Sequence, residues 1–408
     1  MSKLAIHGGA PVRTAPMLSY PIFGEQERAY LLTAFDSGKW WYGARVAEFE
    51  ARFAAFQDAA FGVSCNSGTS ALELALIACG MTAGDEVIIP SYTFIATATA
   101  VLRANAVPVF ADIELATTNL TPELAEQVIT PRTRAIIPVH FGGLPVDMDA
   151  FRELGQRHHL TIIEDACHSW GSQWRGKGTG ALGAAGAFSF QMSKNITSGE
   201  GGMLLTNDEN VATLAGAYAN SGRLPGPALR DFYYPGGNLR MTELQAAILL
   251  AQLEQLGTQT QQRQENAAYL DRGLSGIPGI VVAGSDDPRV TRRAYHLYIF
   301  RHTAETWGVN RERFLAALQA EGIRCFAGYS HPVYRNPLFQ DEQYLRYAPF
   351  RQFPGGEAVH YRDVRCPNAE QLCADACWIQ HAVLLGNERD MQDIVDAVGK
   401  LWECRDEL

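Results

Sequence analysis

Residues 62–79 decide the expected fold class and read Gly-Val-Ser-Cys-Asn-Ser-Gly-Thr-Ser-Ala-Leu-Glu-Leu-Ala-Leu-Ile-Ala-Cys. Residues 62–65 are a short β-rich run, and residues 69–79 are apolar at helical spacing. The same strand-then-helix pattern recurs three times. A strand at 86–89 precedes a helix at 93–105, and a strand at 107–111 precedes a helix near Pro122. A strand at 134–139 then precedes a helix at 147–158, which a further strand at 160–164 follows. This alternation predicts an α/β fold with a large, mainly parallel sheet, whose carboxyl-end loops gather at a ligand site.

The pattern changes near residue 241. Helical spacing over 241–256 and 259–274 is followed by β-rich runs at 280–282 and 293–301 and by helices near 310–321 and 391–403. Residues 326–365, rich in Pro, Tyr and Arg, are expected to be irregular, as long functional loops often are. We therefore predict a large domain over 1–260 and a smaller α+β domain over 261–408, joined by a long helix.

Composition narrows the class of protein. A chain of 408 residues that is 47% hydrophobic is long enough for one large or two moderate domains. The net charge of −10, with no basic run, argues against a nucleic-acid partner. Apolar stretches such as Phe94–Leu102 are too short to span a membrane, and the amino terminus lacks the apolar core of a signal peptide. We expect a soluble, cytoplasmic protein.

The eight cysteines show no disulfide-scaffold spacing. Cys366, Cys373 and Cys377 lie close enough in sequence for a metal site to be considered. However, no histidine has ligand spacing within that cluster, and His381 is only a distant candidate. We expect buried thiols and no metal.

Residues 65–72 connect a predicted strand to an apolar helix through Gly68, Thr69 and Ser70. Glycine allows close approach of the backbone, and a helix amino terminus attracts anions, so this turn is a candidate phosphate site. An ordinary Ser/Thr helix cap is the alternative.

Residues 161–168 read Thr-Ile-Ile-Glu-Asp-Ala-Cys-His. They begin as a β-branched strand, and two carboxylates, Glu164 and Asp165, lie at its end. Asp165 at such a strand end can hold a cationic ring nitrogen protonated, and His168 follows three residues later. The alternatives are a helix-capping Asp beside a solvated Glu, and a neutral core histidine.

Lys194 ends the stretch Ala-Phe-Ser-Phe-Gln-Met-Ser-Lys and precedes the glycine-rich residues 199–202. Burial beside aromatic residues lowers a lysine pKa toward the nucleophilic form that a Schiff base requires. The alternative is a surface lysine in a glycine loop. A phosphate site, a ring-nitrogen carboxylate and an imine-forming lysine together indicate pyridoxal phosphate as cofactor.

Five motifs, in this order and spacing, resemble those of the DegT/StrS-type aminotransferases: SGTSAL (67–72), EDACH (164–168), FSFQMSK (188–194), GEGG (199–202) and GGNLRMTELQAA (236–247). Members of this family are fold-type-I pyridoxal-phosphate enzymes that aminate keto-sugars and related cyclic ketones. The resemblance covers most of the chain and weakens after residue 300. Some members are dehydratases that lack the lysine, so Lys194 favours the aminotransferase branch.

The resemblance implies a role for each matched residue. Lys194 would form the internal aldimine and carry the proton, Asp165 would pair with the pyridine nitrogen, and His168 would contact the ring or its O3′ oxygen. Phe94 would stack on the ring, and Gly68, Thr69 and Ser189 would hold the phosphate. On spacing alone, a core position is favoured for Phe94, and the alternative for Ser189 is a solvent-facing strand hydroxyl.

The resemblance also implies a homodimer with shared active sites, because Asn238 in the family's GxN motif would reach the partner subunit's phosphate. A turn residue is the alternative role for Asn238. The amino donor would be glutamate or glutamine.

The opening LAIHGGAPVR and residues 328–339 resemble the subgroup that acts on keto-inositols (inososes), and aminohydroxybenzoate synthases share much of that pattern. Trp41, Tyr42 and His331 are candidate substrate residues, with interface packing as the alternative. A sugar-nucleotide substrate would need basic residues, for which Arg223, Arg230 and Arg240 are candidates.

Two other classes of protein were considered. The presence of Lys194 and Asp165 argues against a non-catalytic regulator, and the absence of an early GxGxxG motif argues against a nicotinamide dehydrogenase.

Overall fold

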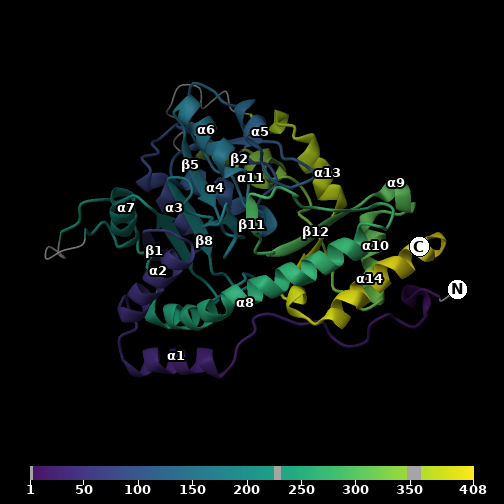
Figure 1. Ribbon diagram of the computed structural model, residues 1–408. Helices are drawn as coiled ribbons and strands as arrows, with labels where there is room; N and C mark the ends of the chain where they lie inside the picture. Colours follow the sequence, from purple (N-terminus) through teal and green to yellow (C-terminus); the bar gives the residue numbers. More distant parts are fainter. Residues whose placement is uncertain (1–2, 225–230, 347–359) are drawn as a thin grey trace.

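The computed structural model describes residues 3–224, 231–346 and 360–408 (Figure 1). Its larger sheet has seven strands in the order β1-β9-β8-β5-β4-β2-β3, and β9 alone runs antiparallel to its neighbours. The strands are β1 Phe61–Cys65, β2 Glu86–Pro90, β3 Val107–Ala111, β4 Thr133–Ile136, β5 Thr161–Asp165, β8 Ala185–Ser189 and β9 Gly202–Thr206. The predicted α/β class with a mainly parallel sheet is confirmed.

Helices cover both faces of this sheet, which explains why β2, β8 and β9 are buried along their whole length. Val87 and Ile89 of β2 pack in one cluster with helices α3, α4 and α7, whereas Ile88 packs in another with α6. On the second face, α2 and the first half of α8 pack against Phe188 and Phe190. These helices are α2 Ala44–Phe56, α3 Gly68–Ala78, α4 Ile95–Arg103, α5 Pro122–Glu126, α6 Met148–His158, α7 Glu209–Ala219 and α8 Glu243–Leu274.

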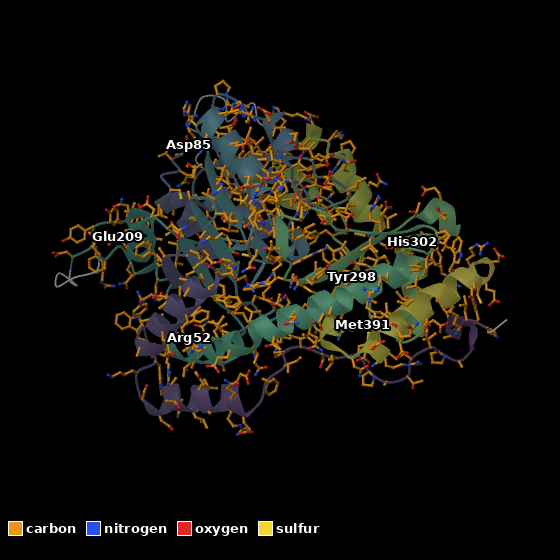
Figure 2. The ribbon with its side chains drawn as sticks, in the orientation of Figure 1. Arg52, Asp85, Glu209, Tyr298, His302 and Met391 are labelled. Atoms are coloured by element: carbon orange, nitrogen blue, oxygen red, sulfur yellow. The ribbon has the colours of Figure 1, made fainter. Side chains whose placement is uncertain are left out.

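A second sheet of four antiparallel strands, in the order β10-β12-β14-β13, lies beside the second half of α8. Tyr298 on β12 donates a hydrogen bond to Asp271 of α8 at 2.8 Å, and Figure 2 shows this tyrosine next to the helix. The elements of this part are β10 Ile280–Val282, β12 Leu297–His302, β13 Phe326–Ala327, β14 Ala376–Gln380, α9 Ala304–Trp307, α10 Arg311–Ala320, α11 Pro337–Gln340, α13 Pro367–Asp375 and α14 Glu388–Glu403.

A third, small sheet joins β6 Gln173–Trp174, β7 Lys177–Gly178 and β11 Val290–Arg292, so it links the two parts of the chain. The amino-terminal segment packs against the second part as well, because the buried carboxylate of Glu321 accepts hydrogen bonds from the backbone of Ala5 and Val12. Figure 1 shows both chain ends beside α14.

Most expected elements agree with the structure within about two residues, but three differences stand out. The two helical runs at 241–256 and 259–274 form one continuous helix, α8. Helices α1 Glu25–Asp36, α2, α7 and α13 were not predicted. Within 326–365 the described residues form short helical turns and β13, and residues 347–359 of that prediction lie outside the described residues.

None of the helices in the described ranges combines the length and apolar character needed to cross a bilayer.

Glu164 at the end of β5 is fully buried, which excludes the solvated glutamate considered from the sequence. One carboxylate oxygen accepts the backbone N–H groups of Leu182 and Gly183, and the other accepts Gly180 N–H and His140 Nε2–H. The His140 tautomer is fixed because its Nδ1 accepts from Val146 N–H. Glu164 therefore fixes the segment between β5 and β8 from inside the core.

Replacing Glu164 by Gln should lower the free energy of unfolding by about 3 kcal/mol, because an amide NH₂ would then face two donors that lose their acceptor. Chemical denaturation followed by circular dichroism measures the change. The exposed Glu153→Gln on α6 is the matched control and should stay within about 0.5 kcal/mol of the parent. Equal midpoints for the two variants would contradict the role of Glu164.

Candidate active site

A cavity of about 500 Å³ opens where the parallel strands end. Its walls come from the turns after β2, β5 and β8, from the amino terminus of α3, and from β12 and β14 of the second sheet. The predicted site residues among its lining are Gly68, Thr69, Phe94, Asp165, His168, Ser189 and Lys194. The structure thus brings seven predicted residues, from four separate segments, to one site.

The amino terminus of α3 forms one wall. Ser67 caps the helix by accepting a hydrogen bond from Ser70 N–H at 3.1 Å, and the first N–H groups of the helix lie at this end. A Cβ atom on Gly68 would lie 2.6 Å from Cβ of Ser189 and 3.0 Å from Sγ of Cys167. Glycine is therefore required for the close approach of α3 to the end of β8.

Asp165 is a buried carboxylate at the end of β5. Oδ2 accepts a hydrogen bond from the Thr97 hydroxyl at 2.8 Å, and Oδ1 accepts from Cys167 N–H at 3.2 Å. Both carboxylate oxygens have lone pairs left, and the group lines the cavity. It can therefore bind a cationic N–H group there.

His168 lines the cavity as a neutral ring. Burial first, and the nearby charge of Lys194 second, hold the pKa of His168 well below its usual range. Its Nδ1 accepts a hydrogen bond from Gly142 N–H at 3.4 Å, so the proton is on Nε2. This histidine can donate one hydrogen bond into the site.

Lys194 lies on the irregular connection between β8 and β9 and is half-buried at the cavity wall. Burial lowers the pKa of Lys194, while the nearby Cys167 and Asp165 act in the opposite direction. Burial also raises the pKa of the Cys167 thiol well above its ordinary value, and Asp165 adds to that rise. The lysine is thus the group of this site that becomes a nucleophile most readily.

The positions of Phe94 and Ser189 exclude the core role and the solvent-facing role that the sequence left open for them. Phe94 is the N-cap residue of α4 and its side chain is 57% exposed at the cavity, so it is not a core residue. Ser189 is buried and lines the cavity instead of facing solvent.

Four other predicted residues do not line the cavity of their own chain: Trp41, Tyr42, His331 and Asn238. All four are exposed, and Asn238 forms a β-bridge with Asn220. Among the arginines considered for a diphosphate, Arg240 stacks on Trp41, Arg223 lies over Phe232, and Arg230 lies outside the described residues.

Several lining residues were not predicted from the sequence, namely Gln191, His296, Phe326, Tyr329, Trp378 and Gln380. Most of them come from the second sheet and its connections, far from the motifs. No group of three or more His, Cys, Asp or Glu side chains in the described part of the chain is placed to hold a metal ion. All eight cysteines are free thiols.

A family model that spans residues 21–399 matches this chain. The chain belongs to the DegT/DnrJ/EryC1/StrS aminotransferase family. It is 36% identical to an L-glutamine:2-deoxy-scyllo-inosose aminotransferase of Micromonospora echinospora, over 100% of both chains.

Two solved structures have the same fold. A crystal structure of 3-amino-5-hydroxybenzoic acid synthase matches with a TM-score of 0.83 and 34% identity, over 95% of this chain and 100% of that one. The structure of S. venezuelae DesV in complex with a ketimine intermediate matches with a TM-score of 0.81 and 32% identity, over 95% and 99%.

The described residues fit pyridoxal phosphate. The helix amino terminus at Gly68 suits a phosphate, the buried Asp165 suits a protonated ring nitrogen, and the amine of Lys194 lies in the same cavity.

Replacing Asp165 by Asn should lower the pKa of Lys194 further, because the substitution removes a negative charge that favours the ammonium form. The pH at which Lys194 becomes reactive should therefore fall. Competitive acetylation of the cofactor-free protein at several pH values, with peptide mapping, measures this. The exposed Lys39 and Lys177 serve as internal references. An unchanged or raised pH of onset would contradict the electrostatic link.

Proposed function

We propose that this chain is a pyridoxal-phosphate-dependent aminotransferase that moves an amino group from glutamine or glutamate to a cyclic ketone. The observation that carries the proposal is the gathering of Lys194, Asp165, His168 and the α3 amino terminus around one cavity. When bound, the cofactor supplies an electron sink that stabilises negative charge at a substrate α-carbon.

Each side chain would then have one task. Lys194 would hold the cofactor through Nζ and, with Nζ free, would take up a proton from the substrate α-carbon and return it. Asp165 would keep the ring nitrogen protonated, and His168 would donate Nε2–H to the ring oxygen. Gly68, Thr69 and Ser189 would bind the phosphate, and Phe94 would cover the ring.

The lining of the cavity favours a polyhydroxylated ring over a nucleotide-linked sugar. Glu200, Gln191, Gln380 and Ser193 supply polar groups beside the aromatic Tyr329, and Lys194 is the one Lys or Arg among the described lining residues. A diphosphate would require further cations. The polar lining, together with the similarity to an L-glutamine:2-deoxy-scyllo-inosose aminotransferase, supports a free keto-cyclitol of the inosose class as the substrate.

An aminohydroxybenzoate-type reaction is a second candidate, favoured by the similarity to the synthase structure. An inosose and a cyclic keto acid that could be converted into 3-amino-5-hydroxybenzoic acid, offered to the enzyme after its donor half-reaction, separate the two. The better acceptor identifies the substrate class.

We further propose that the enzyme is a homodimer with shared active sites. The aromatic side chains of Trp40, Trp41, Phe232 and Tyr233 are each more than half exposed, and burying such side chains against a second copy of the chain would be favourable. Asn238 is exposed and outside the cavity of its own chain, as expected if it acts in the partner subunit's site.

Lys194→Ala should abolish turnover and the visible absorption band of the lysine-bound cofactor while the circular dichroism spectrum stays unchanged. The reason is that no other amine of this chain lines the described cavity. Lys177→Ala, at an exposed lysine, is the control and should keep both band and activity. Full activity in Lys194→Ala would refute the proposed function.

Mixed dimers of Lys194→Ala and Asn238→Asp subunits should regain about half of the parent activity, because one of the two sites would then contain both intact residues. Asn238→Asp alone should be weakly active, since its carboxylate would repel the phosphate. Co-expression with two affinity tags isolates the mixed dimers. Mixed dimers as inactive as the two single variants would show that Asn238 serves the site of its own chain.

A further inference from the structure

The loop that carries Lys194 has few backbone hydrogen bonds of its own near the lysine. Residues 190–201 connect β8 to β9, and the ends of this loop pair through Phe190, Met192, Gly199 and Gly201. Within residues 193–196 the backbone bond inside the loop is from Lys194 N–H to Gln191 O, at 2.9 Å. Oε1 of Gln191 also accepts hydrogen bonds from the N–H and the hydroxyl of Ser193, at 2.9 and 2.8 Å. Contacts from outside the loop add to these bonds and hold the residues next to the lysine.

Those contacts come from three distant segments and hold the residues on both sides of Lys194. His381, after β14, lies with Nε2 at 3.1 Å from the carbonyl oxygen of Ser193. His296, before β12, lies with Nδ1 at 3.0 Å from Oδ1 of Asn195. Tyr20, from the amino-terminal segment, donates its hydroxyl to the carbonyl oxygen of Asn195 at 2.8 Å.

The protonation of both histidines follows from these partners. A carbonyl oxygen only accepts, so Nε2 of His381 must carry the proton. Asn195 donates its amide to the carbonyl oxygen of Ala294, so its Oδ1 accepts and Nδ1 of His296 must carry the proton. Both rings are neutral, because burial holds the pKa of each well below the usual range.

A buried cation supports the His381 tautomer. The fully buried guanidinium of Arg263 on α8 lies beside this ring, with Nη2 3.5 Å from Nδ1 and Nε donating to the His381 carbonyl oxygen at 3.4 Å. A second positive charge on His381 would be repelled there, so Nδ1 stays an acceptor. The rings of His168, His296 and His381 also follow one another, with centroids 4.3 Å and 5.6 Å apart.

We propose that His296 and His381 are positioning residues that hold Lys194 in place for proton transfer by fixing Asn195 and Ser193 on either side of it. Both histidines come from segments that flank strands of the second sheet. This sheet therefore sets the position of the amine, in addition to lining the cavity. This inference rests on the proposed function only for its kinetic consequence, since the hydrogen bonds exist without the cofactor.

Two pairs of variants test the proposal by keeping or removing the hydrogen-bond donor of each histidine. The amide N–H of a glutamine lies near the position of histidine Nε2, and the amide N–H of an asparagine lies near that of Nδ1. His381→Gln and His296→Asn keep the donor, whereas His381→Asn and His296→Gln remove it. The favoured substitution thus differs between the two positions. General damage to packing would favour the same residue at both.

The first measurement is amide hydrogen exchange of a peptide covering residues 191–197 in the cofactor-free protein. The donor-removing variants should exchange about tenfold faster there, the effect of one lost hydrogen bond, while the donor-keeping variants stay within about threefold of the parent. Equal exchange in all four variants, or the same preferred residue at both positions, would overturn the proposal.

The second measurement is the single-turnover rate with L-glutamine and with its α-deuterated form. The donor-removing variants should react about tenfold more slowly, with a larger isotope effect and a half-saturating glutamine concentration within about twofold of the parent. An unchanged isotope effect in variants with faster exchange would overturn the positioning role. If the parent protein itself does not react with any amino donor, the proposed function fails, and the exchange measurement still decides whether the two histidines hold the loop.

Discussion

The amine of Lys194, held half-buried next to the carboxylate of Asp165, is the constraint on which the site depends. A buried ammonium group is costly unless a negative charge lies near, and a buried carboxylate needs donors. Thr97 and Cys167 N–H supply the donors, and the carboxyl ends of β5 and β8 bring the two charges together. The parallel sheet is thus the means by which residues 29 positions apart share one cavity.

Burial of charge also explains the support around the site. Glu164, next to Asp165, has a side chain on the other face of β5, because successive residues of a strand alternate. It binds three backbone N–H groups of the segment that leads to β8. One strand end therefore supplies one carboxylate to the core and a second one to the cavity.

Three of the motif residues were predictable from the sequence because their motifs join the end of a strand to the following turn or helix. Gly68, Asp165 and Lys194 follow this rule, and the structure brings them together. The residues contributed by the second sheet were not predictable. His296 and Trp378 lie in strands or beside them with no local sign of chemistry, and only the packing of the two sheets brings them to the cavity. Helices α1 and α2 were missed for a related reason, since the strand-then-helix alternation that guided the prediction begins only at residue 62.

The most direct test of the central claim is the visible spectrum of the purified protein, recorded with pyridoxal phosphate before and after addition of L-glutamine, and again after addition of a 2-deoxy-inosose. The account predicts a band that disappears with the amino donor and returns with the ketone, in step with formation of the aminocyclitol. A protein that binds the cofactor but whose band is unchanged by glutamine, glutamate and every other amino donor would contradict the assignment of this chain as an active aminotransferase.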